Sequence, residues 1–180
     1  MCRWFIYSGT KTILKMLLYS PSHSLVKQSY KQPNTPFLEF PNNRDHDINV
    51  DGFGLGWYDK KYSEPCLYVN IKPPWNDHNL IRLSKVIDVK LLFAHIRAIK
   101  PFSGSIVHDY NCHPFYFNNF MWMHNGDIGG FYDYKKNIIM KLKENILNNI
   151  KGNTDSEYSF ALFLNSLDND IINNGCYLEP

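Results

Sequence analysis

The most reactive side chain in this sequence lies at its second position. Cys2 follows Met1, and a small residue at position 2 lets methionine aminopeptidase remove the methionine. Cys2 would then carry a thiol and a free α-amine on one residue. An α-amine has a pKa of about 7.7–8.0, so near neutral pH part of it is an unprotonated base that can take the thiol proton. The alternative is that Cys2 is merely the residue after a start codon.

A cysteine nucleophile also needs hydrogen-bond donors for the oxyanion that forms when it attacks a carbonyl. His124, Asn125 and Gly126 follow one another at the end of an expected strand. The Asn125 side-chain amide and the Gly126 main-chain N–H could supply two such donors, and glycine permits a sharp backbone. The alternative is a plain turn, because Asn-Gly is a common turn dipeptide.

Two charged residues could bind the head group of an amino acid. Arg97 ends an apolar segment, where its guanidinium can hold a carboxylate through two parallel hydrogen bonds. Asp155 lies where a helix is expected to begin and could accept a hydrogen bond from a substrate ammonium. The alternatives are an arginine that faces water at a strand end and an acid that the helix dipole favours.

Four histidines and a cysteine raise the question of a metal site. They are His95, His108, His113, His124 and Cys112. Their spacing matches no recognised pattern of metal ligands, so we expect no metal and no cofactor. A metalloprotein remains a third alternative, which stoichiometric metal in the purified protein would support.

These residues must be positioned by a mixture of strands and helices. Hydrophobic periodicity predicts both types of element, and the segment 31–49, rich in proline and asparagine, is expected to be a surface loop. The order of elements indicates an α+β fold with no internal repeat. The expected strands cover residues 3–7, 52–58, 66–71, 89–97, 115–117 and 120–124, and the expected helices 10–19, 76–87, 135–150 and 154–167.

Local signals mark several ends of these elements. Asn76 or Asp77 could cap the helix that follows, and Thr154 with Glu157 forms a capping-box pattern. Asn118-Asn119 is expected to turn a hairpin between two short strands. The glycines of the segment 52–58 suggest that a neighbouring chain segment or a ligand approaches the backbone closely.

Composition excludes several classes of protein. The chain has 180 residues, of which 44% are hydrophobic, 16% aromatic and 20% charged, so we expect one folded domain over residues 2–180. A net charge of +2 is too small to favour binding to nucleic acid or anionic lipid. No apolar run is long enough to span a membrane. Lys11 and Lys15 interrupt any signal-peptide core. Four cysteines without a CxxC pair suggest free thiols and a cytoplasmic protein.

Six blocks of sequence, taken together and in order, resemble the class II glutamine amidotransferases, which are N-terminal-nucleophile hydrolases. The similarity extends from residue 2 to about residue 165, and it is greatest to the short-chain, Dug-type members, of the kind that serve as the amidotransferase subunit of a glutathione-degrading complex. The six blocks are Cys2-Arg3-Trp4-Phe5, DGFGLGWY, FAHIRA, NCHPF, MHNG and NTDSE.

The resemblance implies a role for each candidate residue. Cys2 would be the nucleophile, with Asn125 and Gly126 as the oxyanion hole. Arg97 would bind the α-carboxylate of the substrate and Asp155 its α-ammonium. His113, in the NCHPF block, would line the glutamine pocket, and the DGFGLGWY segment would line it beside the nucleophile.

The resemblance also implies the fold and the reaction. The fold would be an αββα sandwich of two antiparallel sheets flanked by helices, here incomplete because several family strands follow the TDSE helix. The chain would hydrolyse a γ-glutamyl amide, in glutamine or a compound such as glutathione, and release glutamate. A second, peptidase-like or acceptor subunit would be the partner. The alternative is an amidotransferase-like subunit that is inactive or depends on its partner.

Overall fold

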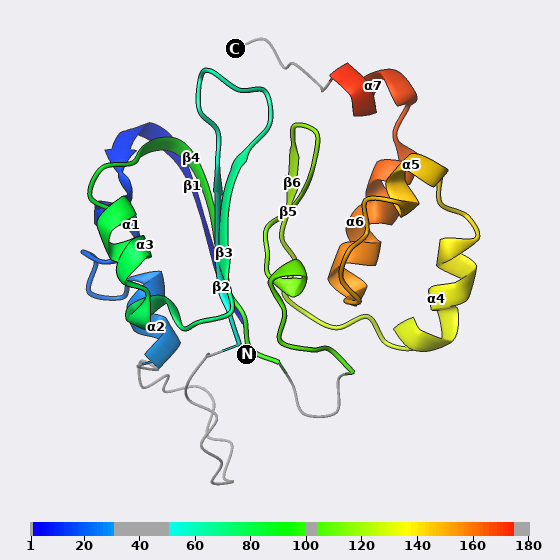
Figure 1. Cartoon of the computed structure of the whole chain (residues 1–180), viewed down its shortest axis with the longest axis horizontal. Coiled ribbons are helices and arrows are strands. Elements are labelled where there is room, and N and C mark those ends of the chain that lie inside the picture. Colours follow the sequence, from blue (N-terminus) through cyan, green and yellow to red (C-terminus); the bar gives the residue numbers. More distant parts are fainter. Residues whose placement is uncertain (1, 31–50, 100–103, 175–180) are drawn as a thin grey trace, which may run out of the picture.

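The structure is a computed structural model that describes residues 2–30, 51–99 and 104–174 (Figure 1). The segment 31–49, expected to be a surface loop, lies outside the described residues. Four strands form an antiparallel sheet in the order β1-β4-β2-β3. They span Arg3–Ile13 (β1), Phe53–Trp57 (β2), Cys66–Asn70 (β3) and Asp88–Ile96 (β4). All four expected strands of this region are therefore present.

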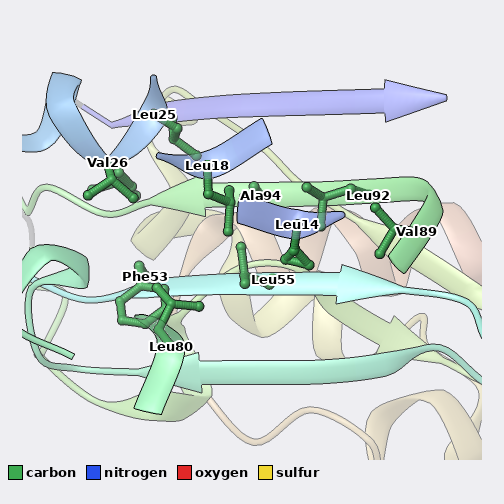
Figure 2. Close-up of a cluster of buried hydrophobic side chains, with 11 residues drawn as sticks. Leu14, Leu18, Leu25, Val26, Phe53, Leu55, Leu80, Val89, Leu92 and Ala94 are labelled. Carbon is green, nitrogen blue, oxygen red and sulfur yellow. The ribbon is translucent and has the colours of Figure 1, made fainter. Parts of the chain in front are cut away.

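Short helices cover one face of this sheet (Figure 1). They are α1 (Leu14–Leu18), α2 (Leu25–Tyr30) and α3 (His78–Leu83), with a 3-10 turn, η1, over Pro74–Asn76. Figure 2 shows leucine and valine side chains from these helices facing β2 and β4. Full burial of such a side chain contributes about 1.5–3 kcal/mol relative to leaving it exposed. The same face carries Phe53, Leu55, Val89, Leu92 and Ala94.

A two-stranded sheet lies against the other face of the first sheet, and further helices lie beyond it (Figure 1). Its hydrophobic cluster is separate from the first and joins the hairpin to α5, α6 and α7. The layers therefore run helices, sheet, sheet, helices. The elements are η2 (Asp109–Asn111), β5 (Phe115–Phe117), β6 (Phe120–Trp122), α4 (Phe131–Ile139), α5 (Glu144–Leu147), α6 (Asp155–Ser166) and α7 (Asn169–Asn174).

Three predictions from local signals are confirmed. The Asp77 carboxylate caps α3 by accepting hydrogen bonds from Asn79 N (2.9 Å) and Leu80 N (3.0 Å). The Thr154 hydroxyl caps α6 by accepting from Glu157 N at 3.3 Å. Asn118, at a φ of 50°, turns the hairpin between β5 and β6. Each signal acts within three residues, so tertiary contacts have little chance to override it.

Three expected helices are wrong in extent, and tertiary contacts are the cause. The helix expected over 76–87 is limited to His78–Leu83, and the carbonyls of Ser84 and Ile87 beyond it accept from Lys15 N (2.8 Å) and Leu14 N (2.9 Å). The helix expected over 10–19 begins only at Leu14, because β1 continues to Ile13 and pairs there with Asp88. The helix expected over 135–150 is broken between α4 and α5. The side-chain amide of Asn165 in α6 accepts from Lys143 N (2.8 Å) and donates to the carbonyl of Lys141 (3.1 Å), so it replaces helical hydrogen bonds at the break.

The glycines of β2 allow the two sheets to approach closely. A methyl group on Gly54 would collide with the main-chain carbonyl of His113, and one on Gly56 would collide with Met121 and Pro114. The close neighbour that the sequence suggested is therefore the segment that leads into β5. This packing brings His113 against the centre of the sheet.

Candidate active site

The chemistry-bearing residues surround one cavity of about 460 Å³. Its lining comes from the N-terminus, the segment after β4 and the segment that leads from β6 to α4, which lie at one end of the two sheets (Figure 1). Five of the six predicted site residues line it: Cys2, Arg97, His113, Gly126 and Asp155. The sixth, Asn125, contacts Cys2, because its side-chain amide donates to the Cys2 carbonyl at 3.3 Å. The structure thus brings together all six residues.

Strand pairing places Cys2 in this cavity. Arg3 lies opposite Ile96 in the β1–β4 ladder, so the residue before Arg3 meets the segment that follows β4. The Cys2 Sγ atom accepts a hydrogen bond from Ala98 N at 3.3 Å and lies 3.4 Å from the Ala98 carbonyl oxygen. These contacts hold the half-buried thiol at the wall of the cavity.

Arg97 is a buried cation at the base of the cavity. Its side chain is 4% exposed, and the guanidinium donates to the carbonyl of Ile106 (2.8 Å) and to the Ser105 hydroxyl. Burial lowers the pKa of Arg97, but an arginine remains charged across the physiological range. Within the described part of the chain, no carboxylate lies in ion-pair distance of this guanidinium. A buried charge without a counter-ion is costly, so the site favours an anionic ligand.

Asp155, the first residue of α6, supplies the negative charge. Its Oδ2 atom accepts from Ile128 N at 2.7 Å and its Oδ1 atom from Ser156 N at 2.8 Å. The Ser156 hydroxyl also donates to Oδ1, at 3.4 Å. A carboxylate can accept about four hydrogen bonds, so these three leave capacity for a ligand. The cavity lining therefore holds Arg97 as its cation and three aspartates, Asp127, Asp133 and Asp155. A cation and an anion from different elements are what an α-amino acid head group requires.

Only half of the predicted capping box forms beside Asp155. The carboxylate of Glu157 turns away from Thr154 and accepts from Lys151 N (2.9 Å) and Gly152 N (2.8 Å). Burial raises the pKa of Glu157, and these two hydrogen bonds oppose the shift. Glu157 thereby fixes the turn that precedes α6, and it borders a second cavity of about 190 Å³ whose lining is mostly apolar.

His113 lines the cavity from the opposite side and stacks on His95. The two ring centroids are 4.2 Å apart, with an interplanar angle of 33°. Both rings are buried, and no nitrogen of the His113 ring has a hydrogen-bond partner among the described residues. Burial, and then the positive charge of Arg97, lower the pKa of His95 to about 3, and burial lowers that of His113 in the same direction. Two neutral imidazoles therefore lie beside the buried guanidinium.

This pair makes stability depend on pH. A histidine that stays neutral in the folded state but titrates near pH 6.5 when unfolded contributes fully above that pH, and its contribution falls as the pH drops towards the folded pKa. For His95 the loss between pH 7 and pH 5 is about 2 kcal/mol. We expect His95→Phe, which keeps a ring and removes the titration, to lessen the pH-dependent loss by that amount in urea unfolding.

The control for this measurement is an exposed histidine. His23→Gln changes a side chain on the surface and is expected to keep the wild-type difference between pH 7 and pH 5. An unchanged pH dependence in His95→Phe would contradict the assignment of a neutral, buried His95.

Twelve other residues line the cavity, and two of them, His124 and Ser156, contact each other. The Nδ1 atom of His124 lies 2.9 Å from the Ser156 hydroxyl, although 32 positions separate the two residues. Each stands next to a selected residue, in MHNG and NTDSE, which is the only signal that could have indicated them. Conversely, no residue of the DGFGLGWY segment lines the cavity, so that expectation is wrong. The segment supports the site instead: the Asp51 carboxylate accepts from Ile99 N at 2.7 Å.

Two other possibilities receive no support from the described parts of the chain. Residues 2–30, 51–99 and 104–174 contain no group of three or more histidine, cysteine, aspartate or glutamate side chains placed to hold a metal ion. No helix within these ranges is long and apolar enough to cross a membrane.

Comparison with known proteins identifies the family. The family model for class II glutamine amidotransferases matches residues 26–176. The chain belongs to the class II glutamine amidotransferases. This match confirms the family that the six sequence blocks resemble, and that family consists of enzymes.

Individual relatives of this class II glutamine amidotransferase agree. The probable glutamine amidotransferase DUG3 of Saccharomyces cerevisiae is 39% identical over 173 residues, which are 93% of this chain and 46% of the yeast protein. A glutamine aminotransferase class II domain protein of Silicibacter pomeroyi has a similar structure, with a TM-score of 0.61 and 27% identity over 94% of this chain and 57% of its own. The chain thus spans about half the length of these relatives.

Proposed function

We propose that the chain hydrolyses the γ-amide of glutamine, or of a γ-glutamyl compound such as glutathione, through a thioester on Cys2. The observation that carries this proposal is the content of one cavity: a thiol, a buried guanidinium that forms no ion pair with a carboxylate of the described residues, and a half-buried carboxylate. Arg97 binds the α-carboxylate of the substrate and Asp155 its α-ammonium. The amide carbon is then directed towards the Cys2 thiol.

The reaction starts once Met1 is removed. The free α-amine of Cys2 takes the thiol proton, and the thiolate attacks the γ-carbonyl carbon. The Asn125 amide turns from the Cys2 carbonyl to the oxyanion and stabilises it together with Gly126 N–H. The C–N bond then breaks, the α-ammonium returns its proton to the leaving amine, and water hydrolyses the γ-glutamyl thioester to glutamate. His113, neutral and without a hydrogen-bond partner among the described residues, offers its ring nitrogens to polar groups of the bound substrate.

The fold supports this assignment. The layers of helices, sheet, sheet and helices (Figure 1) are those expected of the αββα sandwich of an N-terminal-nucleophile hydrolase, and Cys2, the residue directly before β1, lines the cavity. Residues 2–180 form one glutamine amidotransferase domain in this proposal. The released ammonia or amine passes to water or, where one binds, to an acceptor or peptidase-like subunit.

Covalent labelling tests the proposal against an inactive or partner-dependent subunit. We expect 6-diazo-5-oxo-L-norleucine, an electrophilic analogue of glutamine, to add once to the purified protein. Peptide mass spectrometry should find the adduct on Cys2 at an N-terminus without Met1, whereas Cys66, half-buried in β3, should remain unlabelled. A protein that releases no glutamate from glutamine or glutathione and forms no adduct would be the inactive subunit.

A further inference from the structure

Two hydrogen bonds fasten the segment 124–128 to the start of α6. At one end, His124 Nδ1 lies 2.9 Å from the Ser156 hydroxyl. At the other end, Ile128 N donates to the Asp155 carboxylate at 2.7 Å. The residues between the two ties include Asn125 and Gly126, which the proposed mechanism uses as oxyanion donors. This segment has no helix or strand of its own, so the two ties, together with the hydrogen bond from the Asn125 amide to the Cys2 carbonyl, position the donors.

The tie at Ser156 is protected from water. Ser156 is 5% exposed and His124 is partly buried, so bulk water competes little for their hydrogen bond. The Ser156 hydroxyl also donates to the Asp155 carboxylate, at a longer distance of 3.4 Å. Because the serine hydroxyl donates its proton to Asp155, its oxygen accepts a hydrogen bond from His124. The imidazole proton is therefore assigned to Nδ1, and Nε2 faces Gly126.

The arrangement differs from a hydrolytic Ser–His–Asp triad. In a triad the histidine lies between a free serine hydroxyl and the carboxylate. Here the buried serine lies between the histidine and Asp155, so its oxygen is occupied on both sides. The chain of contacts can orient groups, but it does not create a second nucleophile.

We propose that His124 and Ser156 are positioning residues that set the oxyanion donors relative to Asp155. The inference rests on the proposed function, because it assigns these two residues to the same reaction. Substrate binding and oxyanion stabilisation then depend on one rigid unit: the first turn of α6 holds the substrate ammonium at Asp155 and, through Ser156 and His124, the segment that carries Asn125 and Gly126.

This role predicts a particular kinetic signature. Without the tie at Ser156, Arg97 and Asp155 still bind the substrate head group, so ground-state binding changes little. The oxyanion donors lose their alignment, and interactions made chiefly in the transition state determine kcat. Loss of one oxyanion donor costs roughly 100- to 1,000-fold in kcat, so misalignment is expected to cost about 10- to 100-fold.

Steady-state glutamate release from glutamine tests this signature. We expect Ser156→Ala to lower kcat about 10- to 100-fold with KM within about threefold of wild type, and Ser156→Thr, which keeps the hydroxyl, to restore most of kcat. Ser166→Ala is the matched control on the same helix, because its hydroxyl bonds only the Phe163 carbonyl in the contacts described (2.6 Å). A wild-type kcat in Ser156→Ala, or a loss that lies in KM alone, would overturn the proposal.

A second variant keeps the test valid if Ser156→Ala does not fold. His124→Phe keeps a ring but has no Nδ1, and we expect the same loss of kcat. Where both fold, the double variant should lose no more than either single one, because both remove one interaction; additive losses would contradict the tie. A wild-type protein that forms no Cys2 adduct and releases no glutamate would instead refute the proposed function, so the two failures are distinguishable.

Discussion

Cys2→Ala is expected to reduce glutamate release from glutamine by at least about 1,000-fold. The substitution removes the only thiol in the described part of the cavity and leaves the residues that bind the head group in place. Without a nucleophile, the γ-amide meets water with no covalent intermediate to divide the reaction into two easier steps. Because Arg97 and Asp155 remain, isothermal titration should still detect binding of glutamine.

The matched control is Cys66→Ala, the same change in a half-buried residue of β3 that lines neither described cavity. It should retain wild-type turnover. Full activity in Cys2→Ala, or an active enzyme that still carries Met1, would rule out the N-terminal cysteine mechanism. Rates and intact masses should therefore be measured on the same preparations.

Asp155→Asn is expected to lower kcat/KM for glutamine about 30- to 1,000-fold, because the substrate ammonium loses its charged acceptor in a partly buried site. Asparagine has nearly the same shape, so the tie from Ile128 N to the side chain can persist through the amide oxygen. Most of the loss should appear in KM, since the ammonium is bound in the ground state as well as in the transition state.

A substrate without the charge provides the specificity test. N-acetylglutamine lacks the α-ammonium, so wild-type enzyme should strongly prefer glutamine, and Asp155→Asn should narrow this preference. Asp170→Asn is the matched control, because Asp170 is an exposed acid in the first turn of α7. If Asp155→Asn and wild type prefer glutamine over N-acetylglutamine by the same factor, the ammonium is bound elsewhere.

Strong local signals predicted most of the elements correctly. Asp77 and Thr154 are caps because a carboxylate or hydroxyl next to unpaired helical N–H groups satisfies them within three residues. The helix expected over 135–150 had an equally regular apolar pattern and was wrong. The periodicity reports which side faces the core, but it contains nothing about the Asn165 amide that interrupts the helix from another element.

The features of the candidate site also separate into those that the sequence predicted and those that it could not predict. The sequence by itself determined which residue types were present and, through six ordered blocks, the family to which they belong. Only the tertiary structure decided that Arg97 is buried and forms no ion pair with a carboxylate in residues 2–30, 51–99 and 104–174. It likewise decided that the glycine-rich strand supports the cavity rather than lining it, and that His124 contacts Ser156. The physical reason is range: capping, turns and periodicity act over a few residues, whereas burial and counter-ions depend on segments that only the folded chain brings together.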